Sequence, residues 1–323
     1  MNKYILIILA MFLASCSYID NYDANEIVFN RLDVALADYA SMDDDDRENV
    51  IDSLGDVIDV WFGIQGVYDV NDSVLIEYSK SSAVVIFSSD IRTLLRSKCD
   101  KFNSVLKLQE NMHNYLEINE FYDLYSVVSP YNQSIFIVDS IMFVGFNHYL
   151  GSDYVGYNYF EPYQRITKTP QHLVYDVAEA TIVDKFPYKR KNDATVLNVL
   201  LYNGAIVYAI MQLVPNANLA EVLGYTKEQL DWAESNEKNA WNTLIARKLL
   251  YSTNSLDANR LVNPSPVTTI LHQESPGRLG RFIGYKIVKS YVEKHPEINL
   301  KRLLSPDFYN SLQSLIDSDY GVR

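Results

Sequence analysis

Three side chains with metal-binding chemistry share one predicted helix face. His172, Asp176 and Glu179 stand at i, i+4 and i+7, so a helix would align an imidazole with two carboxylates. These groups are ligands of zinc, and a carboxylate beside zinc can act as a general base. The alternative, which we favour, is an ordinary helix start with a solvent-facing His172 and with Asp176 stabilised by the helix dipole. No two of the five histidines, at positions 113, 148, 172, 272 and 295, are four residues apart.

A second group of charged side chains surrounds the dipeptide Pro276-Gly277. It consists of Glu274, Arg278 and Arg281. A guanidinium group presents a planar fork that matches carboxylates and phosphates. Either Glu274 pairs with Arg278 and braces this loop, which we favour, or the group forms a surface for a ligand or a partner protein.

Both groups lie in a half of the chain that is predicted to be helical. Thr169-Pro170 supplies an N-cap and a first-turn proline, so a helix is expected from there to about Asp184. Further helices are expected over 194–213 (capped by Asn192 or Asp193), over 226–250, and from 275 to about 294.

Two features of the later helices indicate close packing. Gly280, Gly284 and Val288 follow one another at intervals of one turn. Because glycine in a helix interior costs about 1 kcal/mol relative to alanine, two on one face predict a close helix crossing. Trp232 and Trp241 are expected in the core, whereas an exposed Trp232 would be an anchor for a protein partner.

The first half of the chain mixes helices and strands. Helices are predicted over 48–61 and 90–118, short strands over Val74–Tyr78 and Ala83–Phe87, and a solvated loop over Asp43–Asp46. Three more strands, over 122–128, 134–138 and 141–146, are separated by short turns and predict a meander. A mixed first half followed by a helical half predicts an α+β fold.

The N-terminus resembles a bacterial lipoprotein signal. Lys3 precedes the apolar run Tyr4–Leu13, and the small residues Ala14 and Ser15 stand before Cys16. This resemblance implies that residues 1–15 are a signal peptide, that Cys16 is acylated, and that residues 16–25 are a tether. The apolar run is shorter than the ~20 residues of a membrane span, and no segment after residue 16 is expected to be long and apolar enough to span a membrane.

Composition limits the function classes. A chain of 323 residues with 48% hydrophobic content can form one large domain or two smaller ones, and we expect subdomains over 26–151 and 152–323. The formal net charge of −13 disfavours nucleic acid as a partner, since the field repels phosphates. No glycine-rich phosphate loop and no serine nucleophile elbow is present, and no cofactor is expected.

The second half carries short motifs in a recognisable order. In chain order these are Tyr149-Leu150-Gly151, Tyr163-Gln164-Arg165, Asp176-Val177-Ala178-Glu179-Ala180, Gly224-Tyr225-Thr226, Leu230-Asp231-Trp232, Asn236-Glu237, Leu249-Leu250-Tyr251-Ser252-Thr253 and Glu274-Ser275-Pro276-Gly277-Arg278-Leu279-Gly280. With the fragment around Arg31 and Asp33, they resemble the gliding-motility lipoprotein family GldB, best over about residues 120–305.

That family is related to predicted zinc-dependent proteases, so the resemblance implies a zincin-like fold. An active zincin presents H-E-x-x-H on one helix, and a later helix supplies a third ligand. Here Glu179 falls at the general-base position, Ala178 and Ile182 at the histidine positions, and Asn203 at the third ligand. Because catalytic zinc needs about three protein ligands, this pattern implies neither bound metal nor catalysis.

The resemblance therefore implies a lipid-anchored, non-catalytic protein of the cell envelope that binds other proteins of a gliding and secretion machinery. Ser17 carries no obvious inner-membrane retention signal, so the periplasmic side of the outer membrane is expected. Two alternatives stay open: a divergent zinc peptidase or hydrolase using His172, Asp176 and Glu179, and a module that binds a peptide at a sheet edge. The candidate cleft or partner residues are Glu179, Asn203, Trp232, Glu274, Arg278 and Arg281.

Overall fold

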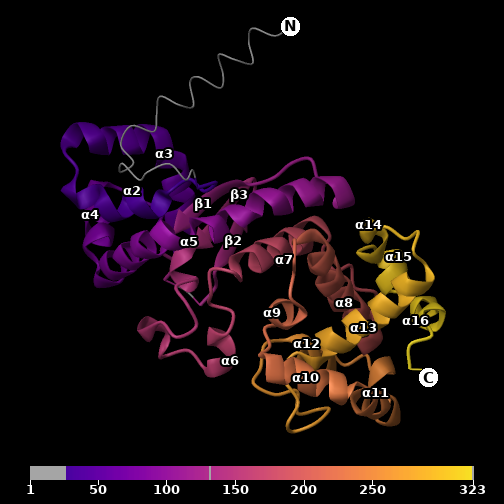
Figure 1. Cartoon of the computed structure of the whole chain (residues 1–323). Helices are drawn as coiled ribbons and strands as arrows, with labels where there is room; N and C mark the ends of the chain where they lie inside the picture. The colour runs from indigo at the N-terminus through magenta and orange to yellow at the C-terminus, as the bar shows by residue number, and fades with distance from the viewer. Residues whose placement is uncertain (1–26, 131, 322–323) are drawn as a thin grey trace, which may run out of the picture.

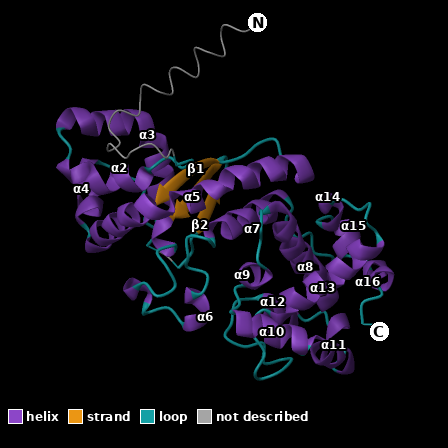
Figure 2. Ribbon diagram, viewed as in Figure 1, coloured by secondary structure: helices purple, strands orange, loops and turns teal. Residues whose placement is uncertain are grey.

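The computed structural model of the chain describes residues 27–130 and 132–321 (Figure 1). The predicted signal peptide, the lipid-attachment residue Cys16 and the tether to residue 25 lie outside the described residues. A small sheet lies in the N-terminal half and helices form the C-terminal half (Figure 2). The predicted α+β class is confirmed.

Helices fill most of the chain before the sheet. They are α2 (Leu32–Asp38), α3 (Asp44–Ile64), α4 (Asp72–Lys80) and α5 (Ser82–Leu116). The helix predicted over 48–61 is confirmed within the longer α3, and the one predicted over 90–118 is confirmed by α5, which begins earlier and ends at Leu116. The loop predicted over Asp43–Asp46 is wrong, because the Asp43 carboxylate accepts a hydrogen bond from the Asp46 N–H at 2.9 Å and caps α3. Acids in a first helical turn are also favoured by the helix dipole.

The strands predicted over Val74–Tyr78 and Ala83–Phe87 are wrong, since both segments are helical. The cause lies just before them. Asn71 accepts a hydrogen bond from the Val74 N–H at 3.3 Å, and Ser81 accepts one from the Val84 N–H at 3.4 Å. These caps open α4 and α5, and short apolar runs alone do not distinguish strand from helix.

The sheet contains β1 (Asp123–Val127), β2 (Ile135–Val138) and β3 (Ile141–Gly145) in the order β1-β3-β2. The strand positions are predicted well, but the meander is wrong because β1 pairs with β3 in parallel. Only β2 and β3 form a hairpin, which turns at Asp139 with a φ of 51°. The parallel pairing places Val127 and Phe143 together against Trp61 of α3, while the other sheet face joins the main core.

The C-terminal half is a set of packed helices (Figure 1). They are α6 (Pro162–Arg165), α7 (Leu173–Lys185), α8 (Val196–Leu213), α9 (Leu219–Leu223), α10 (Lys227–Ser235), α11 (Glu237–Ala246), α12 (Ser255–Val262), α13 (Leu279–Lys294), α14 (Leu300–Leu303), α15 (Pro306–Tyr309) and α16 (Leu312–Ser318).

The helix positions are predicted better than their ends. Helix α7 starts at Leu173 rather than at Thr169, and the N-cap of α8 is Thr195 instead of Asn192 or Asp193. The helix predicted over 226–250 is divided at Asn236 into α10 and α11. Helix α13 starts after Arg278, whose left-handed backbone (φ 56°) separates it from the preceding loop.

The predicted close helix crossing is confirmed: α13 lies directly on α8. A Cβ atom on Gly284 would lie 2.0 Å from the Leu200 carbonyl oxygen, and one on Gly204 would lie 2.1 Å from the Gly284 carbonyl carbon. Gly280 is also enclosed, because its Cβ would lie 2.8 Å from Leu261. The two backbones are therefore in contact without intervening side chains.

Helix α8 forms the centre of the helical half. It is 18 residues long and apolar enough to cross a membrane by length and composition, so the prediction of no such segment is wrong. However, 72% of it is buried inside the protein, against α7, α12 and α13. A helix that is apolar all round is buried, and here other helices provide that environment.

The last described residues pack against the C-terminal, helical half. Helix α16 packs on α13. The Tyr320 hydroxyl donates a hydrogen bond to Glu237 at 2.9 Å, and its ring lies 4.9 Å from the Trp241 ring. One hydrophobic core extends from Phe29 to Tyr309 through both predicted subdomains, whose boundary at residue 151 stays a prediction.

Candidate functional site

His172 and Asp176 form a pair at the start of α7. The His172 Nε2 atom lies 3.3 Å from an Asp176 carboxylate oxygen, and the Tyr149 hydroxyl donates to the same carboxylate at 2.8 Å. His172 is only 7% exposed, so its predicted solvent-facing position is wrong. Because α7 begins at Leu173, His172 is the N-cap residue, and its ring packs edge-on against Tyr175.

The Asp176 carboxylate is ionised although much of its side chain is buried. Burial alone raises the pKa of its carboxyl group, but His172, the Tyr149 hydroxyl and Arg278 together hold that pKa below its ordinary value. A third of the side-chain surface, 33%, is exposed. The carboxylate is therefore ionised at neutral pH and faces a solvent-accessible cavity.

Glu179, the predicted general-base position, forms an ion pair with Arg281. The Arg281 Nη2 atom donates to the Glu179 carboxylate at 2.8 Å, and the Arg281 side chain is 4% exposed. Burial raises the pKa of Glu179, but Arg281 and Arg278 outweigh this effect and hold it below its ordinary value. The Glu179 carboxylate is thus held in an ion pair with the Arg281 guanidinium group.

The residues present do not fit a zinc ion. Ala178 and Ile182, at the two histidine positions, are fully buried in the core. Asn203 uses its amide N–H to bond the Val199 carbonyl within α8 at 2.9 Å. Across residues 27–130 and 132–321, no group of three or more His, Cys, Asp or Glu side chains is placed to hold a metal ion. His172 and Asp176 pair with each other while Glu179 pairs with Arg281, so the three side chains form no ligand set.

A cavity of about 240 Å³ lies between α7 and the loop before α13. Arg278, Lys168 and Asp176 bring charge to its wall, and Tyr225 and His148 also line it. The predicted brace between Glu274 and Arg278 is absent from the described residues, because Glu274 is exposed on another hollow. Arg278 faces the cavity instead.

Lys168 and His148 are functional candidates that sequence reasoning missed. The Lys168 ammonium group donates to Nδ1 of His148 at 2.6 Å and lies 4.1 Å from the centre of the Phe160 ring. Burial lowers the pKa of Lys168 to about 8, against a smaller opposing effect of Asp176. Neither residue belongs to a spaced pattern, whereas Tyr225 stands in a motif that carries the family resemblance.

The other predicted cleft residues lie elsewhere. Asn203 lines a second hollow of about 260 Å³ between α8 and α12. Trp232 and Glu274 line a third, of about 330 Å³. Trp232 is half-buried, with its ring centre 5.4 Å from that of His272, so the structure supports neither full burial nor full exposure.

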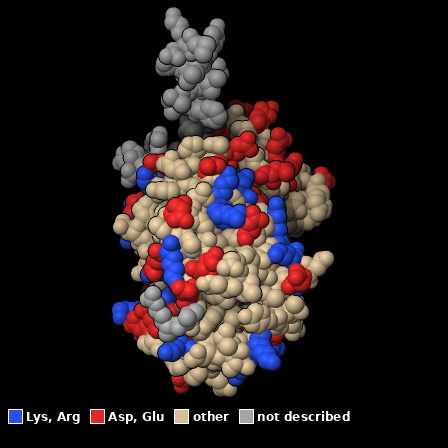
Figure 3. Space-filling view, turned by 90° about the vertical axis from the view of Figure 1, so that its right-hand side faces the viewer, with Lys and Arg blue, Asp and Glu red and all other residues tan. Residues whose placement is uncertain are grey.

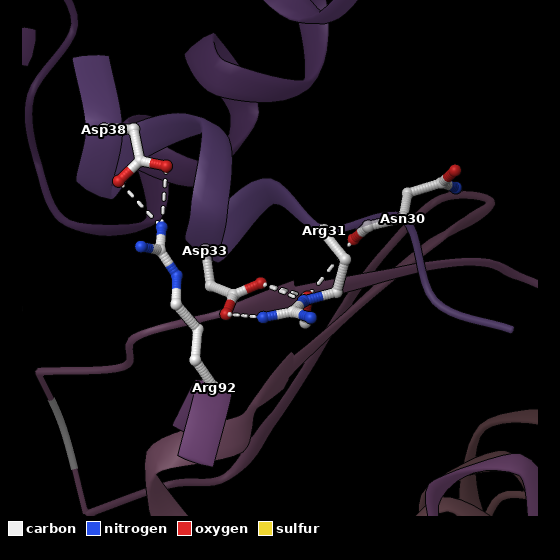
Figure 4. Close-up of polar contacts among 6 residues, drawn as sticks. Asn30, Arg31, Asp33, Asp38 and Arg92 are labelled. Carbon is white, nitrogen blue, oxygen red and sulfur yellow. Dashed lines mark hydrogen bonds and ion pairs between the residues drawn. The ribbon is translucent and has the colours of Figure 1, made fainter. Parts of the chain in front are cut away.

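The N-terminal fragment of the resemblance forms a buried ion pair, and a second, partly exposed ion pair lies nearby (Figure 4). Arg31 Nε and Nη2 each donate to the Asp33 carboxylate at 2.8 Å, and the Ser126 hydroxyl donates to it from β1. Nearby, Arg92 of α5 donates to both oxygens of Asp38 at 2.7 Å. Asp33 is 1% exposed. The two ion pairs and the Ser126 hydrogen bond connect α2, α5 and the sheet, so their role is structural.

The sheet offers little edge for an added strand. The outer side of β1 is bridged in its middle by Asn30, opposite Tyr125. Within the described chain only the four-residue β2 has an open side. The predicted binding of a peptide at a sheet edge therefore depends on one short strand.

The surface carries mixed charge. On the face drawn in Figure 3, basic and acidic side chains are interspersed, and acidic ones gather along its upper right. A continuous basic stripe of the kind that follows a nucleic-acid backbone is not seen among the described residues on this face.

One of the comparisons with known proteins matches nearly the whole chain. A family model for the gliding motility protein GldB matches residues 17–320. Comparisons with curated proteins and with solved structures gave no match. The sheet, the cavity and the crossing of α8 with α13 all lie inside the matched range, and the relationship to zincins stays a prediction.

Proposed function

Because the chain belongs to the GldB family of gliding motility proteins, a family of cell-envelope lipoproteins, we propose that it is a non-catalytic binding protein of the gliding machinery. In this proposal Cys16 is acylated and anchors the protein to the outer membrane on its periplasmic side. The folded body then binds other envelope proteins of the motility and secretion apparatus. The half-buried Trp232 beside Glu274 is its candidate partner anchor.

The ion pair between Glu179 and Arg281 carries the non-catalytic part of the proposal. A general base must be free to take a proton and works best with a pKa near the working pH. Glu179 is held by a buried guanidinium group, which lowers its pKa. The resemblance to zincins would place two metal-binding histidines at Ala178 and Ile182 of α7, and both of these are core residues.

Replacement of Glu179 tests this role. Glu179→Gln keeps an acceptor for Arg281 and removes the proton-accepting carboxylate. We expect gliding speed, compared at equal levels of folded protein, to stay within about twofold of wild type, whereas loss of a general base costs a hydrolase about 100-fold or more. Glu48→Gln, which changes an exposed glutamate on α3 outside every candidate site, serves as the matched control. Loss of gliding by a normally folded Glu179→Gln protein, or stoichiometric zinc that disappears in His172→Ala, would contradict the proposal.

The two cysteines allow a matched test of the anchor. Cys16→Ser is expected to abolish incorporation of labelled palmitate and to release the protein from the membrane fraction, since an acyl chain supplies the membrane affinity. Cys99→Ser, which alters the other cysteine, should retain both properties. Fractionation of inner and outer membranes provides the measurement. Retention of Cys16→Ser in membranes would show that another segment anchors the chain.

A further inference from the structure

The cavity between α7 and α13 contains more positive than negative charge. Arg278 and Lys168 supply two cations to its wall, and Asp176 supplies one carboxylate. That carboxylate is already bound by His172 and the Tyr149 hydroxyl. One carboxylate, already bound by other groups, therefore stands against two cations in this cavity.

Arg278 has no bonded acid among the described residues. Its guanidinium group forms no hydrogen bond and no ion pair with any described residue, and Asp176 and Glu179 act on it only through space. Burial, followed by the nearby Arg281, lowers the pKa of Arg278. The partly buried guanidinium group therefore faces the cavity with its hydrogen-bond donors available to an anion.

Two other donors face the same space. The Tyr225 hydroxyl is buried without a hydrogen-bond partner among the described residues, although Tyr225 is only 5% exposed. Lys168 is 7% exposed, and its contact with Nδ1 of His148 brings no acid to its ammonium group. Buried polar groups in proteins are normally satisfied, so these donors mark a place for an acceptor.

The size and wall of the cavity limit the ligand. Its volume of about 240 Å³ is below the range of ~300–1,000 Å³ that is usual for sites of drug-sized ligands. Gln164, Gln229 and Ser265 add polar groups to the wall, while Phe160 and Tyr163 add rings. A small molecule with an anionic group and a compact body matches these features.

We propose that this cavity binds a small organic anion through a carboxylate or phosphate group held by Arg278, Lys168 and the Tyr225 hydroxyl. The planar fork of Arg278 fits two oxygens of either group. The site goes beyond the proposed function, which concerns membrane and protein partners. It gives the protein the means to respond to a diffusible molecule.

The first test uses inorganic phosphate and acetate as probes, with sodium chloride at equal ionic strength as the reference. Melting temperature and calorimetric affinity are measured on the full mature chain in detergent. We expect phosphate or acetate to raise the melting temperature, because a ligand that binds only the folded state stabilises it. The more effective probe identifies the chemical group. A wild-type protein that responds to neither beyond sodium chloride would overturn the proposal.

Three variants separate binding from stability. Arg278→Met is expected to weaken anion affinity by about tenfold or more while leaving the anion-free melting temperature unchanged or higher. Tyr225→Phe should weaken binding severalfold without loss of stability, since its hydroxyl is unpaired in the anion-free protein. Arg260→Met removes an exposed arginine from α12 and should bind as wild type does. If Arg278→Met melted lower and still bound both probes normally, Arg278 would be a structural brace and the site would be excluded.

The pH dependence provides a further check through Lys168. The groups that face its ammonium are His148, Asp176 and Tyr157, with Phe160 beneath it. Since its pKa is lowered to about 8, the ammonium loses its proton as the pH rises through that value. Acetate affinity should therefore fall between pH 7 and 9, and the fall should be absent in Lys168→Met. An equal fall in both proteins would exclude Lys168 from the site.

Discussion

Gly284→Ala is expected to lower the free energy of unfolding by about 3 kcal/mol or more, at the upper end of the cost of overpacking. The added methyl group would lie 2.0 Å from the Leu200 carbonyl oxygen and 2.9 Å from its carbon, both of which are backbone atoms of α8. No side-chain rotation relieves such a contact, so α8 and α13 must separate along the centre of the core. A fall in melting temperature of about 5 to 10 °C is expected.

Gly55 provides the matched control because it is also a helical glycine. In α3 the atom nearest to its Cβ would be a methyl carbon of Ile51, at 3.8 Å, which is an ordinary contact. Gly55→Ala is therefore expected to be neutral or to stabilise by up to about 1 kcal/mol, the difference in helix propensity. Denaturant titration of both variants provides the measurement. Equal stabilities would show that the crossing is looser than the structure describes.

Asp33→Asn should be the second most damaging single change, with an expected loss of about 3–5 kcal/mol in unfolding free energy. Asp33 accepts two hydrogen bonds from Arg31, and their side chains are 0% and 10% exposed. Removing the carboxylate charge leaves the Arg31 guanidinium buried beside a neutral amide. Asp59→Asn on α3, which removes an exposed acid, is the control and should change stability by less than about 0.5 kcal/mol.

The same pair predicts how stability depends on pH. Burial raises the pKa of Asp33, but Arg31, Ser126 and Arg92 together hold it below its ordinary value. A carboxyl group whose pKa is lower in the folded than in the unfolded state contributes its full stabilisation above its ordinary pKa of about 4. That contribution is lost as the pH falls through the lower, folded value. Wild-type unfolding free energy should thus decline below about pH 4, and the decline should be shallower in Asp33→Asn.

Sequence reasoning predicted those features that depend on local patterns. The strands around Val127 and Ile135, the helix over 194–213 and the glycine face of α13 are all confirmed, because periodicity and glycine spacing determine them directly. The family is confirmed by the match over residues 17–320. Caps were underestimated: Asn71 and Ser81 convert apolar segments that resemble strands into helices.

The pairing of side chains that are distant along the chain could not be predicted from the sequence. Arg281 forms an ion pair with Glu179, which is 102 positions away, whereas local spacing favoured Glu274 with Arg278. The parallel pairing of β1 with β3 is likewise a tertiary choice, which places Val127 and Phe143 on one face. Lys168 carries no motif, and only the folded chain brings it beside Arg278.

The contact between the last described residues and α11 bears on when this protein can fold. Tyr320 bonds Glu237, and Gly321 lies so close to the Trp241 indole that a methyl group would not fit there. Tyr320 follows Glu237 by 83 positions, yet it covers one side of the helical half. This half should therefore reach its final packing only when the chain is available as far as residue 321. A bulky group attached at residue 321 would interfere with this closing step.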